Sequence, residues 1–157
     1  MIIRSANQND VQQLTSIKRP TEEHRTRFAE IHANRLAQAV QGKAVYFVAE
    51  DAGEIVGHVF LKFYGSETEP DCPNIEDLYV REDRRGSGIG SALLSRCEAL
   101  LREKGYGRVG LSVNPELNPR AKALYERLGY INVSRAPYLG GVYDGDEDWV
   151  IDMVKLL

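Results

Sequence analysis

The sequence lacks the residue clusters that mark several kinds of active site. Its 157 residues include only two cysteines and three histidines. Cys72 and Cys97 form no metal-ligand pattern, and His24, His32 and His58 share no metal-binding spacing. No Ser-His-Asp or Cys-His arrangement indicates a covalent nucleophile. We therefore expect neither a metal site nor a nucleophilic triad.

Long apolar runs are also missing. Polar residues at Arg4 and at positions 7–10 interrupt the first apolar segment, so we expect no signal peptide. No run is long and apolar enough to span a membrane. The net charge of −3 and the pI of 5.7 disfavour a nucleic-acid binder that neutralises phosphates. The expectation is a cytoplasmic protein without nucleic-acid or membrane partners.

What is present is an ordinary globular composition. Hydrophobic residues make up 43% and charged residues 27% of the chain, as in soluble domains of this size. No internal repeat, linker or low-complexity tract divides it. We expect one domain over residues 1–157. Cys97 lies on the apolar stripe of an expected helix and is interpreted as a small buried hydrophobe.

The most informative stretch runs from residue 76 to residue 91. Residues 75–80 favour a strand, and residues 91–104 repeat apolar side chains at helical spacing before Gly105, a C-cap candidate. Arg84, Arg85 and three glycines lie between these elements. Glycines at a helix start let the backbone approach a ligand, and the free N–H groups favour an anion. The stretch therefore predicts a phosphate or pyrophosphate site.

Two other phosphate-binding motifs do not match. A P-loop needs Lys-Ser/Thr after its last glycine, whereas Ser91-Ala92 follows Gly90. A dinucleotide fingerprint starting at Gly86 would need glycine or alanine at position 91, and one starting at Gly88 would need glycine at position 93. A helix that merely starts with glycines remains an alternative.

Residues 85–90, Arg-Gly-Ser-Gly-Ile-Gly, fit the arginine/glutamine-x-x-glycine-x-glycine/alanine signature of the GNAT superfamily of acyl-CoA-dependent N-acetyltransferases. Residues 118–130 resemble that family's asparagine-x-x-alanine-x-x-leucine/phenylalanine-tyrosine-x-x-x-glycine-phenylalanine/tyrosine segment. Residues 76–80 are similar to the corresponding strand of spermidine/spermine and some aminoglycoside acetyltransferases. One departure is Glu82, where many relatives carry proline, and it affects the turn more than the chemistry.

The order of expected elements resembles this fold over nearly the whole chain. Strands are expected at residues 2–4, 44–50, 55–64, 75–80, 109–113, 130–133 and 149–156, and helices at 11–17, 21–42, 91–104 and 119–128. The segment before the last strand is expected to be an irregular loop. The resemblance implies an α/β (α+β) GNAT fold, with a single mixed, centrally splayed sheet of about seven strands flanked by four helices.

The resemblance also implies acetyl-CoA as co-substrate. Its pyrophosphate would bind mainly to backbone N–H groups of one contiguous segment. The residues of that segment are Arg85, Gly86, Ser87, Gly88, Ile89, Gly90 and Ser91. In the family the preceding strand is splayed, which would free backbone groups at Leu78 and Val80, around Tyr79, for the pantetheine arm and the acetyl carbonyl. Asn118 is a further cofactor contact, a helix cap, or both.

Glu76 is the candidate general base. An amine acceptor arrives as an ammonium ion and must lose a proton before it attacks a thioester. In the similar strands this glutamate accepts that proton through water. Strand periodicity places Glu76 on the same face as Leu78 and Val80 unless a bulge intervenes, and turns Asp77, a lesser candidate, the other way. The alternative is a solvated carboxylate or one paired with an arginine of the following turn.

Tyr125 is the candidate general acid. The departing thiolate needs a proton, and a phenol with a pKa of about 10 carries one at neutral pH. Leu124 and Leu128 show that its helix has an apolar face, so core packing is the alternative. With no nucleophilic triad, the acetyl group would pass by direct attack in a ternary complex.

The acceptor is identified only by charge. Acidic residues precede the strand at 75–80 and the last strand, and their convergence would attract a cationic primary amine, such as a polyamine, aminosugar or basic peptide end. They are Glu67, Glu69, Asp71, Asp144, Asp146, Glu147 and Asp148. Tyr138 and Tyr143 either edge the acceptor site or lie on a solvated hairpin tip. His24, His32, Arg25, Arg27 and Arg35 are interpreted as a solvated helix face.

The sequence thus predicts an N-acetyltransferase that acts on a small-molecule or peptide amine. The alternative is a non-catalytic acyl-CoA-binding sensor or interaction module of the same fold. The presence of both Glu76 and Tyr125 favours the enzyme. Many relatives pair through their C-terminal strands, so the resemblance leaves a homodimer open.

Overall fold

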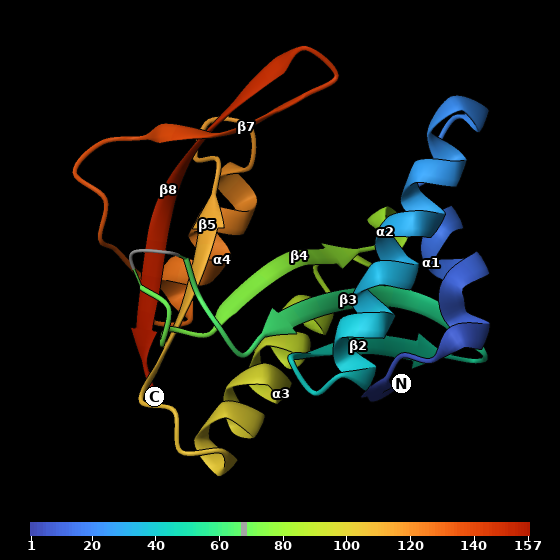
Figure 1. The fold of residues 1–157 in the computed structure, drawn as a ribbon, viewed down its shortest axis with the longest axis horizontal. Helices are drawn as coiled ribbons and strands as arrows, with labels where there is room; N and C mark the ends of the chain where they lie inside the picture. Colours follow the sequence, from blue (N-terminus) through green and yellow to red (C-terminus); the bar gives the residue numbers. More distant parts are fainter. Residues whose placement is uncertain (67–68) are drawn as a thin grey trace.

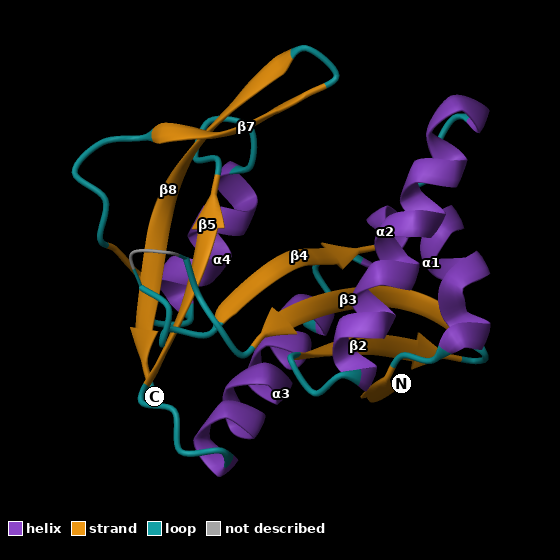
Figure 2. Ribbon diagram, in the orientation of Figure 1, coloured by secondary structure: helices purple, strands orange, loops and turns teal. Residues whose placement is uncertain are grey.

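The computed structural model describes residues 1–66 and 69–157. Its framework is one eight-stranded sheet (Figures 1 and 2). The strands are β1 (Ile2–Ser5), β2 (Ala44–Asp51), β3 (Glu54–Lys62), β4 (Asn74–Val80), β5 (Arg108–Val113), β6 (Ile131–Asn132), β7 (Tyr138–Tyr143) and β8 (Asp146–Leu156). They lie in the order β1-β2-β3-β4-β5-β8-β6, with β7 paired to β8. Among the described strands, β4 and β5 alone pair in parallel, so the sheet is mixed, as expected.

Strands β4 and β5 run side by side at one end only. Their register pairs Asn74 with Gly110 and Ile75 with Leu111. Beyond these pairs the two strands diverge, β4 toward the two N-terminal helices and β5 toward β7 (Figure 1). Residues 76–80 therefore have no strand partner on the β5 side. The central splay is confirmed.

Four α-helices cover the sheet in the described part of the chain: α1 (Val11–Ser16), α2 (Glu22–Val40), α3 (Ile89–Glu103) and α4 (Pro119–Arg127). The alternation of β2 sends Tyr46 and Val48 into a core with α1 and α2, and sends Phe47 and Ala49 into a larger core with α3. A strand covered on both faces reads as a continuous apolar run. None of the described helices is long and apolar enough to cross a membrane.

The segment expected to be an irregular loop contains strand β7. It forms a hairpin with β8, which begins at Asp146 rather than at Trp149. The two residues of the turn, Asp144 and Gly145, have φ angles of 52° and 85°. Two consecutive left-handed residues make the turn whose twist matches paired strands, and Asp-Gly is its preferred sequence. The Asp-Gly pair is readable in the sequence and would have predicted the hairpin.

Candidate active site

Strand β4 carries a bulge just beyond the point where it leaves β5. On β3, His58 pairs with Tyr79 and Phe60 pairs with Glu76, so one residue of β3 stands against two of β4. Asp77 lies in the bulge and has a φ of 50°, a left-handed conformation that is uncommon outside glycine. An extra residue in one strand shifts the alternation of the side chains that follow it.

The expectation that Glu76 shares a face with Leu78 and Val80 is wrong for this reason. Ile75 and Leu78 both pack against the core under α3, although ideal alternation would place them on opposite faces. Glu76 instead forms an ion pair with Lys62 of β3 at 2.6 Å, not with an arginine of the following turn. It nevertheless lines a cavity together with Asp77.

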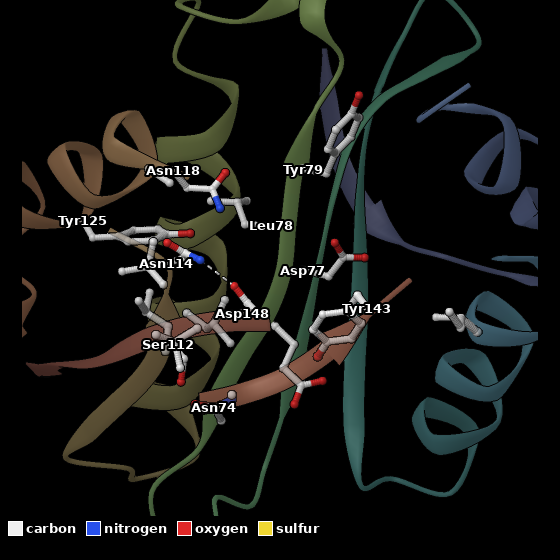
Figure 3. Close-up of a pocket in the computed structure, with 18 of the residues that line it drawn as sticks. Asn74, Asp77, Leu78, Tyr79, Ser112, Asn114, Asn118, Tyr125, Tyr143 and Asp148 are labelled. Atoms are coloured by element: carbon white, nitrogen blue, oxygen red, sulfur yellow. Dashed lines mark hydrogen bonds between the residues drawn. The ribbon is translucent and has the colours of Figure 1, made fainter. Parts of the chain in front are cut away.

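Two cavities open beside the splay. The α3–α4 cavity, of about 750 Å³, lies between the glycine-rich turn and the start of α4. The α2–β7 cavity, of about 770 Å³, lies between α2, β4 and the β7–β8 hairpin (Figure 3). The residues that border both are Leu78, Tyr79, Asn118, Ala121 and Tyr125. Two ligands, one in each cavity, would therefore meet beside Tyr125.

The α3–α4 cavity is lined by positive charge. Arg84, Arg85, Arg120 and Arg127 border it, and no described lining residue is a carboxylate. Arg84 is held by Asp51 at 2.6 Å. The sequence predicted the first two arginines but missed the pair on α4, whose spacing of seven residues places both on one helix face. An anionic ligand fits this lining.

The start of α3 adds backbone donors to the same cavity. Gly88 is the N-cap residue with a φ of 85°, and Gly86 has a φ of 77°. The first intrahelical hydrogen bond runs from the N–H of Ala92 to the carbonyl of Gly88. The N–H groups of the three residues between them therefore have no acceptor within the helix. These are Ile89, Gly90 and Ser91, all on the cavity wall. The arginines and the helix start together suit a pyrophosphate group.

Tyr125 is nearly buried where the two cavities meet. Its side chain is 7% exposed, and its ring packs 5.9 Å from that of Tyr130. Burial, with a smaller contribution from Asp77, raises the pKa of Tyr125 to about 12. Its hydroxyl points into the α2–β7 cavity (Figure 3). Tyr125 packs in the core and also lines the cavity, and its role as general acid stays a prediction.

Two asparagines shape the start of α4. Asn118 occupies the N-cap position, but its side chain makes no capping bond and borders both cavities instead. Asn114, which the sequence analysis missed, accepts backbone bonds from Glu116 and Leu117 and donates to Asp148 at 2.8 Å. The dashed line in Figure 3 marks the last of these bonds. Asn114 thereby links the loop before α4 to β8.

A buried polar cluster lies on the α2 side of the β4 bulge. The two carboxylate oxygens of Asp77 pair with Lys18 at 2.5 Å and with Arg35 at 2.6 Å. Burial alone would raise the pKa of Asp77, but the neighbouring His58, Lys18 and Arg35 outweigh it and hold the pKa well below its usual range. The assignment of Arg35 to a solvated helix face is therefore wrong.

Two histidines complete this cluster. His32 Nδ1 lies 2.7 Å from the hydroxyl of Tyr46, which lies 3.4 Å from His58 Nδ1. Burial is the largest cause and lowers the pKa to about 4 for His32 and about 3 for His58, although the charge of Asp77 acts in the opposite direction. Both imidazoles are therefore neutral at pH 7. His32 is 3% exposed, so its assignment to a solvated face is also wrong. Only the fold brings these distant residues together.

The expected convergence of acidic loops does not occur among the described residues. Glu69 pairs with Arg108, and Asp144 pairs with Arg27 at 3.2 Å. Of the seven acidic residues, only Asp148 lines the α2–β7 cavity, and Glu67 lies outside the described residues. Tyr138 and Tyr143 do line it. No group of three or more metal-ligating side chains occurs in the part of the chain that is described.

Two cavities that meet beside a splayed sheet, one of them lined by arginines, are the features to compare with known proteins. A model of the acetyltransferase (GNAT) family matches residues 9–130. The chain therefore belongs to the GNAT acetyltransferase family. Both segments that carried the resemblance in the sequence, 85–90 and 118–130, lie inside the match.

Two curated relatives match part of the chain. A mycothiol acetyltransferase of Thermobispora bispora is 39% identical over 90 residues, which is 55% of this chain and 30% of the relative. A thialysine N-epsilon-acetyltransferase of Caenorhabditis elegans is 30% identical over 105 residues, which is 66% of this chain and 65% of the relative. The chain thus spans less than two thirds of either relative.

Solved structures share the whole fold. A ribosomal-protein-alanine N-acetyltransferase from Brucella melitensis has a TM-score of 0.81 at 22% identity and full coverage of both chains. The PaiA N-acetyltransferase from Thermoplasma acidophilum, solved in complex with coenzyme A, has a TM-score of 0.75 at 17% identity, covering 99% of this chain and 98% of that one. At these identities the likeness shows the fold alone.

Proposed function

We propose that this protein transfers the acetyl group of acetyl-CoA directly to a primary amine. The observation that carries the proposal is the pair of cavities that share Tyr125 as a wall. One cavity is positively lined and suits the phosphates of coenzyme A. The other leaves room for a small molecule or the end of a peptide. The names of the relatives include both kinds of acceptor, thialysine and a ribosomal protein.

Residues 85–91 would bind the pyrophosphate, with Arg120 and Arg127 adding charge from α4. The unpaired edge of residues 76–80 would bind the pantetheine arm and the acetyl carbonyl through backbone groups. An N–H group held by the bulge would then lie where negative charge develops on that carbonyl. Asn118, free of a capping bond, would contact the cofactor between these two parts.

Tyr125 would protonate the departing thiolate. Its raised pKa, about 12, keeps the hydroxyl protonated throughout the physiological range. Glu76 would accept the amine's proton through a water molecule, from its position on the wall of the α2–β7 cavity. Asp77 is the weaker base, because two cations occupy its oxygens and hold its pKa low.

The test is a thiol-release assay with acetyl-CoA and a panel of polyamines, aminoglycosides, amino acids and peptides. Release of free coenzyme A that depends on the acceptor, with acetylated amine found by mass spectrometry, would support the enzyme. Binding of acetyl-CoA without thiol release for any amine would contradict it. That result would favour the non-catalytic acyl-CoA-binding module.

A further inference from the structure

The α2–β7 cavity has an uncompensated positive charge on its α2 side. Lys18 and Arg35 both line it, and both are paired with the single carboxylate of Asp77. Within the described chain, neither cation has a second ion-pair partner. His32 and His58 are neutral and cannot change the balance. One carboxylate offsets one of two positive charges, so one charge remains.

These cations are partly removed from water. The side chain of Arg35 is 15% exposed and that of Lys18 is 31% exposed. Lys18 lies 5.1 Å from the centre of the Tyr79 ring, and Arg35 lies 5.4 Å from that of Phe60. A charge that has lost part of its hydration gains more from a bound counter-ion than an exposed one does.

Both cations keep hydrogen-bond donors for a ligand. An ammonium group has three donors and a guanidinium has five. Asp77 takes one bond from Lys18 Nζ and one from an Arg35 Nη1 nitrogen. Arg35 also interacts with Tyr46, which leaves further guanidinium donors. Lys18 and Arg35 line the cavity, and Phe28 and Ile31 add apolar surface to it. A short alkyl chain could lie against that surface while an anionic group reaches Lys18 and Arg35.

The opposite wall carries negative charge. Asp148 on β8 accepts a hydrogen bond from the neutral side chain of Asn114 and lines the cavity. Glu76 on β4 also lines it but is paired with Lys62. The cavity therefore carries surplus positive charge at Lys18 and Arg35 and a negative side chain, Asp148, on β8. This polarity suits a molecule that carries both an anionic group and an amine, and it does not suit a polycation.

We propose that the acceptor is an amino-acid-like amine whose carboxylate binds to Lys18 and Arg35. Its amine would lie toward Glu76 and Tyr125. The inference rests on the proposed acetyltransferase function and narrows its acceptor class. It replaces the expectation of a purely cationic acceptor, which depended on acidic loops that the fold holds apart.

The experiment compares L-lysine, L-lysinamide and cadaverine, which share the same amine-bearing chain and differ at the carboxylate. Thiol release from acetyl-CoA is measured for the wild type and for Lys18→Met, Lys18→Arg and Lys43→Met. Lys43 is an exposed lysine outside the cavity and serves as the matched control. Lys18→Met leaves the Asp77–Arg35 pair in place, so it removes only the surplus charge.

We expect wild-type kcat/KM for L-lysine to exceed that for cadaverine and L-lysinamide by about tenfold or more, the value of a charge-assisted bond. Lys18→Met should abolish this preference by raising KM for L-lysine with little change in kcat. Lys18→Arg should keep the preference, and Lys43→Met should match the wild type. Equal or better use of cadaverine, or a preference that survives in Lys18→Met, would overturn the inference.

Failure of the proposed function is distinguishable from failure of this inference. If the protein binds acetyl-CoA but acetylates none of the three compounds, the complex with coenzyme A is titrated with L-lysine and cadaverine by calorimetry. Binding of L-lysine alone, weakened in Lys18→Met, would sustain the carboxylate site while the enzyme proposal fails. No binding of L-lysine, or binding unaffected by Lys18→Met, would overturn the site as well.

Discussion

The two cavities differ in how the chain builds them. Every residue of the α3–α4 cavity comes from one of two stretches, 78–91 and 117–127. The α2–β7 cavity draws on Lys18, just after α1, and on α2, β4, β5, α4, β7 and β8. The first is made by local structure, a glycine turn and two helix starts. The second exists only when distant elements pack, and its charges differ from those that the sequence suggested.

The largest effect is expected from a substitution that disrupts only the α3–α4 cavity. Gly88→Val should lower the affinity for acetyl-CoA by about 1,000-fold or more, because a branched side chain at a left-handed helix start blocks the approach of a phosphate. Gly88 has a φ of 85° and no atom near the added Cβ, so the fold itself has room for the change. Calorimetric titration with acetyl-CoA measures the loss.

Gly105→Val is the matched control for that variant. Gly105 also has a φ of 85° and open space around it, but it follows the C-terminus of the same helix. Both variants should lose a similar amount of stability, about 1–3 kcal/mol for a strained left-handed residue. Equal acetyl-CoA affinity in the two variants would show that Gly88 does not lie at the cofactor.

The next largest effect is expected from a substitution in the wall of the α2–β7 cavity. Asp77→Asn removes the carboxylate shared by Lys18 and Arg35 and should lower the free energy of unfolding by about 3 kcal/mol, because two partly buried cations lose their counter-ion. Because the pKa of Asp77 is lowered in the fold, its contribution is present above the unfolded value of about 3.9 and is lost as pH falls below it.

Urea unfolding at several pH values measures this contribution. The difference between wild type and Asp77→Asn should be constant from pH 7 to about pH 5 and shrink below about pH 4. Asp152→Asn, at another carboxylate with two hydroxyl donors but outside the ion-pair cluster, is the control. A difference that persists unchanged at low pH would mean that Asp77 acts by shape rather than by charge.

The third effect concerns the residue shared by both cavities. Tyr125→Phe should lower kcat by about 100-fold with little change in the acetyl-CoA Kd, because the hydroxyl acts on the leaving thiolate. The control is Tyr130→Phe, whose hydroxyl bonds Glu98 in the core away from both cavities. It should cost stability but leave kcat unchanged.

The pH dependence of the rate is a second test of Tyr125 as the general acid. A general acid must be protonated, and a pKa raised to about 12 keeps the active form present as pH rises. The wild-type rate should therefore not fall between pH 8 and about pH 10, where an ordinary tyrosine would begin to ionise. A basic limb near pH 10 that persists in Tyr125→Phe would assign the acid to another group.

The smallest expected effect concerns Glu76. Glu76→Gln should lower the rate about tenfold near neutral pH and recover part of it at alkaline pH, where more of the amine is already neutral. Glu147→Gln, at a carboxylate that lines neither cavity, is the control. A wild-type rate in Glu76→Gln would leave the carboxylate as a structural partner of Lys62.

The sequence analysis succeeded where the signal was contiguous. Residues 85–91 predicted the glycine turn and helix start, and residues 118–130 predicted α4 and the place of Tyr125. The Asp144-Gly145 turn was equally readable but was missed. The roles of Glu76, Tyr125 and the segment 85–91 remain predictions, because geometry places these residues at cavities without showing what they do there.

The bulge in β4 is the physical reason why the predicted face of Glu76 was wrong. Periodicity assigns faces by counting residues, and a single unpaired residue reverses every assignment beyond it. Aspartate adopts a left-handed backbone more often than most residues, but this preference is too weak to mark one position in a strand. In the fold, Asp77 contacts two cations that lie 59 and 42 positions away in the chain.

The sequence by itself indicated the family, the order of the elements apart from β7, and the glycine-rich turn before α3. These follow from short-range physics: backbone conformations of glycine, alternation along strands and helical repeats. The tertiary structure alone decided which charges face the second cavity. It buried His32, half-buried Arg35 against Asp77, paired Glu76 with Lys62 and kept Glu69 and Asp144 away from the cavity. Electrostatic partners are chosen by distance in space, which a linear pattern of charges does not contain.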